Sequence, residues 1–121
     1  MITIIITDYS IKNQVFNKHI PDANNSFLKK LANAIKSQRW EKFKIYDTFF
    51  YKIYIDKTEY RAVINELTEN KFAIIYYRHK NELYSKNISK YDNLSTDKIY
   101  SNYIKVLEHI QENKFMQITY N

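Results

Sequence analysis

The stretch that decides the fold is FFYKIYIDKTEYRAVINELTENKFAIIYYRH, residues 49–79. It contains three runs rich in the β-branched and aromatic residues that strands favour: Phe49–Asp56, Glu59–Glu66 and Lys71–His79. Only Lys57-Thr58 and a polar turn around 68–70 separate these runs, so they are predicted to form an antiparallel meander. Because the chain has no glycine, Asn70 is the best candidate for the left-handed position of the second turn.

The lengths of the two turns predict which side chains share a face of the sheet. A two-residue loop at Lys57-Thr58 places Arg61 opposite Tyr54, and a second loop centred on 69–70 places Arg78 opposite Arg61. One face is then apolar and is expected to be the core: Phe49, Tyr51, Ile53, Ile55, Tyr60, Ala62, Ile64, Ala73, Ile75 and Tyr77. The other face is expected to be open, basic and aromatic: Phe50, Lys52, Tyr54, Arg61, Val63, Asn65, Ile74, Tyr76 and Arg78. The assignment depends on loop parity, because a slip of one residue reverses every side chain.

The flanking segments add helices and further strands. Ile2–Thr7 is β-branched and apolar and is expected inside the sheet, whereas 10–20 and 26–36 have helical spacing and are expected to form a helical hairpin. Residues 38–48 are expected to be a loop with some strand character, and 81–94 a polar loop whose residues 82–86 could extend the sheet. Thr96 is a suitable N-cap for a third helix ending near Asn113, which is expected to pack on the domain or pair with a second copy. A last strand is expected at 115–120.

The chain is therefore expected to be one α+β domain, residues 1–121. The predicted order is an N-terminal strand, a helical hairpin, a three- to four-stranded antiparallel sheet and an extra C-terminal helix.

Composition narrows the functional classes. Nineteen Lys and Arg against thirteen Asp and Glu give a net charge of +6, which favours a polyanionic partner. Ile, Lys, Asn and Tyr have codons poor in G and C, so an AT-rich genome also explains an excess of lysine. The three arginines, Arg39, Arg61 and Arg78, are therefore better evidence for an anionic partner than the lysines. The lack of cysteine excludes Cys-ligated metals and disulfides, and the lack of glycine excludes nucleotide-binding glycine loops, so neither a metal nor a cofactor is expected.

Residues 1–7 lack the features of a signal peptide, and no stretch reaches the roughly 20 apolar residues of a membrane span. A soluble cytoplasmic protein without a membrane partner is expected.

The strand segments resemble the RelE/ParE superfamily of bacterial toxins. The resemblance covers roughly residues 2–86 and is carried by Tyr60-Arg61-Ala62-Val63-Ile64, by residues 72–80 and by Tyr84. Residues 95–121 exceed the shorter members, and the glycine usual before the Tyr-Arg strand is missing. The resemblance implies a toxin of a type II toxin-antitoxin system that acts on mRNA or the ribosome and is held by a cognate antitoxin protein. Its enzymatic members are metal-free endoribonucleases, whereas ParE-like members poison DNA gyrase.

The resemblance also implies roles for individual residues. Arg61 corresponds to the strand arginine that holds the scissile phosphate, and the other catalytic candidates are Arg78, His79, Tyr84, Lys52 and Glu59. Metal-free RNA cleavage needs a base, an acid and cations around the phosphate; arginine suits the last role and His79 the acid. The expected nucleic-acid contacts are Lys52, Tyr54, Arg61, Tyr76, Arg78, Lys80 and Lys86. The alternative is that the third helix covers this face, which would make the protein a binding module without an RNA cleft.

Overall fold

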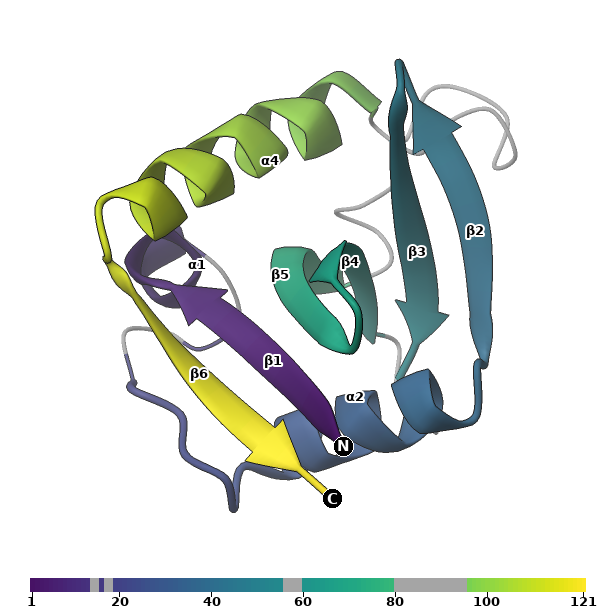
Figure 1. Ribbon diagram of the computed structural model, residues 1–121, viewed down its shortest axis with the longest axis vertical. Coiled ribbons are helices and arrows are strands. Elements are labelled where there is room, and N and C mark those ends of the chain that lie inside the picture. Colours follow the sequence, from purple (N-terminus) through teal and green to yellow (C-terminus); the bar gives the residue numbers. More distant parts are fainter. Residues whose placement is uncertain (14–15, 17–18, 56–59, 80–95) are drawn as a thin grey trace.

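The computed structural model describes residues 1–13, 16, 19–55, 60–79 and 96–121. In these residues a six-stranded mixed sheet has the strand order β2-β3-β4-β5-β1-β6. The elements follow the chain as β1 (Ile2–Thr7), α1 (Asp8–Asn13), α2 (Ser26–Lys36), β2 (Trp40–Ile45), β3 (Thr48–Tyr54), β4 (Tyr60–Thr68), β5 (Lys71–His79), α4 (Thr96–Gln111) and β6 (Phe115–Tyr120). Figure 1 shows α2 on one side of the strands and α4 on the other. The α+β class is confirmed.

The predicted meander is confirmed in β3, β4 and β5. The register pairs Tyr54 with Arg61 and Lys52 with Val63, and it pairs Arg61 with Arg78. Asn70 occupies the left-handed turn position with φ 62°. The Arg61–Arg78 pair has the predicted register because two register shifts, between Val63 and Ile64 and between Glu66 and Thr68, cancel each other.

The extent of the sheet differs from the prediction of three to four antiparallel strands. Residues 40–45, expected to be a loop with some strand character, form β2 and pair with β3. β1 lies parallel to β5 and antiparallel to β6. β1 is therefore an interior strand, and contacts with α2 and with α1 and α4 bury almost all of its side chains.

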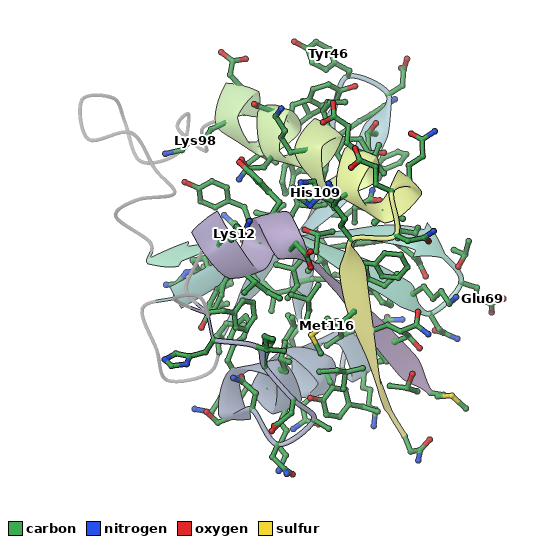
Figure 2. All side chains as sticks on the ribbon, turned by 90° about the vertical axis from the view of Figure 1, so that its left-hand side faces the viewer. Lys12, Tyr46, Glu69, Lys98, His109 and Met116 are labelled. Atoms are coloured by element: carbon green, nitrogen blue, oxygen red, sulfur yellow. The ribbon has the colours of Figure 1, made fainter. Side chains whose placement is uncertain are left out.

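The predicted helical hairpin is not formed. α1 is only six residues long and contacts α4, β1 and β5, whereas α2 covers the opposite face of the sheet (Figure 1). Figure 2 shows His109 on the side of α4 that faces α1, and its ring lies edge-on to Tyr9 with centroids 5.9 Å apart. The two N-terminal helices therefore pack on opposite faces of the sheet.

Both long helices end without glycine. Gln38 follows α2 with φ 53° and Asn113 follows α4 with φ 60°. The N–H of Arg39 donates to the carbonyl of Ala34, and that of Lys114 donates to the carbonyl of His109, which closes each helix in the manner of a Schellman motif. At the other end of α2, the Asn25 side chain accepts a hydrogen bond from the Leu28 N–H and so caps the helix.

A β-bulge in β5 changes the predicted faces. Val63 pairs with Tyr76 but Ile64 pairs with Ile74, so Ile75 is the extra residue. Ala73 and Ile75, expected on the α2 side, therefore lie with Tyr76 in the core under α4, and Ile74 lies in the core under α2. A second shift, between Glu66 and Thr68, makes Leu67 an extra residue of β4, so the predicted faces are exchanged only between the two shifts.

The face that was expected to be open is closed over its centre by α4. Phe50, Val63 and Tyr76 are buried together with Ile99 and Val106 of the helix. The prediction that the C-terminal helix packs on the domain is confirmed, whereas pairing with a second copy stays a prediction. Of the helices in the described ranges, none combines the length and hydropathy of a bilayer-spanning segment.

Candidate nucleic-acid interface

Part of the predicted basic face remains accessible where β3 ends and β4 begins. We call this site the cationic corner and define it by Glu41 of β2, Lys52 and Tyr54 of β3, Arg61 of β4 and the backbone position of Arg78 on β5. The register places Glu41 opposite Lys52 and Tyr54 opposite Arg61. Cross-strand neighbours on one face lie about 5 Å apart at Cβ, so four adjacent strands contribute to one small site.

Tyr54 lies at the centre of the cationic corner. The Cζ atom of Arg61 is 4.4 Å from the centroid of the Tyr54 ring, and the Lys52 Nζ is 5.2 Å from it. The side chain of Tyr54 is 43% exposed. Both distances are within the range of cation–π attraction, which is worth about 0.5–1 kcal/mol at an exposed site. The ring therefore lies close to two cationic side chains at once.

Glu41 joins the corner from the edge strand. Its Oε2 atom lies 3.2 Å from the Lys52 Nζ, and its Oε1 atom accepts a hydrogen bond of 3.3 Å from the Tyr54 hydroxyl. This carboxylate orients both side chains and offsets one positive charge. Glu41 was not among the predicted site residues because its segment was expected to be a loop, and the alternation of polar and apolar residues over 40–45 is too weak to indicate a strand.

The two arginines occupy paired positions at the ends of β4 and β5. Arg61 and Arg78 are direct Cα partners in the register, as the turn lengths predicted. Like charges that face each other across a strand pair destabilise the sheet, and a phosphate placed between them would reverse that effect. The register therefore places the backbone positions of the two arginines side by side.

Tyr76 does not belong to the accessible site. Its side chain is only 2% exposed and lies in the core under α4, and the Lys98 Nζ lies 5.8 Å from its ring centroid. A base cannot stack on a ring buried to that extent. The predicted nucleic-acid contact at Tyr76 is therefore wrong, because the C-terminal helix occupies the surface.

The remaining predicted residues are only partly tested. His79 ends β5 at a backbone position paired with Tyr60, and its side chain lies outside the description, as does that of Arg78. Glu59, Lys80, Tyr84 and Lys86 lie outside the described residues altogether. The residues that the structure describes contain no group of three or more His, Asp or Glu side chains arranged to hold a metal ion.

Comparison with protein families, curated proteins and solved structures finds no match to this chain. The resemblance to the RelE/ParE superfamily stays a prediction from short motifs, and the functional argument rests on the geometry of the cationic corner.

Proposed function

We propose that the cationic corner binds RNA, and that the protein is a toxin-type endoribonuclease that cleaves mRNA without a metal ion, on the ribosome, under the control of an antitoxin protein. The observation that carries the proposal is the pairing of Arg61 with Arg78 beside the exposed ring of Tyr54. Arginine matches phosphate oxygens with two parallel donors and keeps its charge at any physiological pH. An aromatic ring next to such a cation offers a surface on which a base can stack.

In the proposed reaction the chain's own residues move one proton at each end of the reacting phosphate. A base takes the proton of the 2′-hydroxyl, the 2′-oxygen bonds to phosphorus, and the bond to the 5′-oxygen breaks as an acid protonates it. The products are a 2′,3′-cyclic phosphate and a free 5′-hydroxyl. Arg61 and Arg78 hold the charge of the pentacoordinate phosphate. The resemblance assigns the proton transfers to Lys52 or Glu59 and to His79 or Tyr84.

The position of α4 limits how RNA approaches. Because the helix covers Phe50, Val63 and Tyr76, a strand cannot lie across the middle of the sheet on that face. RNA therefore approaches at the cationic corner, and Glu41 is displaced from Lys52 as the phosphate binds. The Glu41 side chain is 60% exposed but the Lys52 side chain is only 12% exposed, so the phosphate has to take the place of the carboxylate beside a largely buried ammonium group.

The test is cleavage by the purified chain and by single variants. The 5′ ends of mRNA are mapped after expression of the wild type, Arg61→Ala, Arg78→Ala and the control Lys30→Ala, which removes one exposed charge from α2. Cuts with 5′-hydroxyl ends that vanish in both arginine variants and persist in the control support the proposal. Cuts that are absent from the wild type, or that persist in Arg61→Ala, would overturn it.

The second candidate is a non-enzymatic interaction protein on the same fold, such as a gyrase inhibitor or a phage or plasmid protein that binds a host target. The observation in its favour is the coverage of the sheet by α4, which leaves a corner rather than a cleft. Gyrase poisoning would produce covalent DNA breaks while mRNA stays intact. A plain nucleic-acid-binding domain would show steeply salt-dependent affinity without turnover.

A further inference from the structure

A second aromatic and basic surface lies on the opposite face of β2 and β3. We call it the Trp40 surface and define it by Trp40, Lys42 and Lys44 of β2 and Phe49 and Tyr51 of β3. The register pairs Lys42 with Tyr51 and Lys44 with Phe49. Because side chains alternate along a strand, these residues point away from the face that carries Glu41 and Lys52. The Trp40 surface and the cationic corner therefore use the same two strands but opposite faces.

Aromatic rings and lysines alternate closely on the Trp40 surface. The rings of Trp40 and Tyr51 are stacked with centroids 4.0 Å apart and an interplanar angle of 26°. The Lys42 Nζ is 4.4 Å from the centroid of the Phe49 ring, and the Lys44 Nζ is 5.4 Å from it. Phe49 itself is 48% exposed, because α2 packs on the sheet beside it without covering it. Exposure of the apolar Phe49 ring to water is unfavourable. The same ring offers a face on which a second flat ring can stack.

The charge of this surface is available to a partner. Within the described ranges neither Lys42 nor Lys44 forms an ion pair with a carboxylate. On the other face of the same strands, Lys52 is paired with Glu41. The lysines of the Trp40 surface are therefore the better phosphate ligands, since no intramolecular pair has to break.

A pocket of about 490 Å³ adjoins the stacked rings. Its wall includes Trp40, Tyr51, Lys36, Gln38, Glu66 and Asn70. Pockets of this size accept small planar ligands, and donors and acceptors from amide, ammonium and carboxylate groups can read the edge of a heterocycle. The Tyr51 hydroxyl is a hydrogen-bond donor at neutral pH, and burial and, secondarily, the charge of Glu66 raise its pKa further.

We propose that the Trp40 surface binds single-stranded nucleic acid, with one base stacked on Phe49, the next base in the pocket beside Trp40, and phosphates contacted by Lys42 and Lys44. Stacking on an aromatic side chain is worth about 1–3 kcal/mol per base, the two exposed cation–π contacts on Phe49 together about 1–2 kcal/mol, and the displaced lysines gain phosphate contacts. A base therefore displaces the ammonium groups from the Phe49 ring, and their flexible stems let them turn to the phosphates. An acidic peptide would satisfy the lysines but would leave the rings without a partner. The inference does not rest on RNA cleavage, because it uses no residue of the cationic corner.

The chain contains a single tryptophan, so its fluorescence reports on this surface directly. The full chain is titrated with oligo(rU), oligo(dT) and poly-glutamate while Trp40 emission is recorded. We expect quenching by both oligonucleotides and none by poly-glutamate. Phe49→Ala should raise the dissociation constant by about 10-fold, because one base loses its stacking partner. Lys42→Ala with Lys44→Ala should reduce the slope of log affinity against log salt by about 0.7 per lysine.

Two matched controls keep the outcomes distinct. Lys98→Ala with Lys105→Ala removes two charges from α4, on the other side of the sheet, and should leave quenching unchanged. Arg61→Ala should abolish mRNA cleavage but not quenching, so quenching without cleavage in the wild type would defeat only the proposed function. Absence of quenching by either oligonucleotide, equal quenching by poly-glutamate, or full affinity in both the Phe49 and the lysine variants would overturn the inference.

Discussion

The docking of α4 on the sheet determines how much of the basic face RNA can reach, and one buried side chain tests it. Ile99 is 0% exposed and contacts the core formed by Phe50, Val63 and Tyr76. Ile104 lies on the same helix but is 39% exposed. We predict that Ile99→Ala destabilises the protein strongly and that Ile104→Ala does not.

The magnitude follows from the burial. Truncating a fully buried isoleucine to alanine removes its transfer free energy and leaves a cavity, which together cost about 2–5 kcal/mol. Taking about 3 kcal/mol, the melting temperature of a domain of this size should fall by about 10 °C. The same truncation at Ile104 should cost about 0.5 kcal/mol or less, because most surface substitutions stay within that range. Helix propensity changes equally in both variants, so their difference isolates burial.

The assay is urea denaturation followed by circular dichroism, with thermal melts as a second measure. A gap of about 2 kcal/mol or more between the two variants is expected. If both variants lose the same free energy to within about 0.5 kcal/mol, α4 does not dock on this face as described. The open, basic face inferred from the sequence would then have to be restored, together with stacking on Tyr76.

Three further predictions test local features of the fold. Asn25→Ala should lower the free energy of unfolding by about 1 kcal/mol in urea titrations, since it removes the cap of α2; an unchanged midpoint would contradict the cap. Gln38→Gly should raise stability by about 1 kcal/mol because it relieves a left-handed non-glycine residue, whereas Asn113→Gly should change it little, since asparagine tolerates that conformation. The hydrogen bond and charge of Lys114 hold the pKa of Glu112 below its ordinary 4.5, so the carboxylate stabilises the fold above that pH and the effect is lost as the pH falls through the lowered pKa. In Lys114→Ala the Glu112 carboxyl resonance should titrate closer to 4.5, and an unchanged titration would contradict the pairing.

Local turn chemistry made the central meander predictable. The lengths of two connections predicted Arg61 opposite Tyr54 and Arg78, and the second pairing holds because two register shifts between β4 and β5 cancel. The bulge at Ile75 was not predictable in the same way, because no glycine or proline marks it and both of its faces are apolar. Helical spacing likewise indicated that α4 must bury an apolar stripe, but it did not indicate which surface of the sheet that stripe would cover. The position of β1 between β5 and β6 depends on pairing between distant segments, which local pattern does not encode.

In the candidate site, too, positions set by neighbouring segments were predictable and positions set by distant segments were not. Lys52, Tyr54 and Arg61 could be placed together because adjacent strands and one short loop determine their spacing. Glu41 and the burial of Tyr76 could not be predicted, since they depend on an edge strand with weak alternation and on a helix that returns from the end of the chain.

β2 contributes to both proposed surfaces. Because side chains alternate along the strand, its charged residues are divided between the two faces of the sheet. Glu41 points to the cationic corner, while Lys42 and Lys44 point to the Trp40 surface. The register of β2 is set by a two-residue turn between Ile45 and Thr48, in which Tyr46 has a φ of 53°. The Tyr46 ring packs edge-on against Tyr100 of α4, with centroids 4.8 Å apart. A slip of one residue in this hairpin would move a carboxylate to the Trp40 surface and a lysine to the corner, exchanging the charges of both. The contact with α4 therefore stabilises the turn on which the charge of each surface depends.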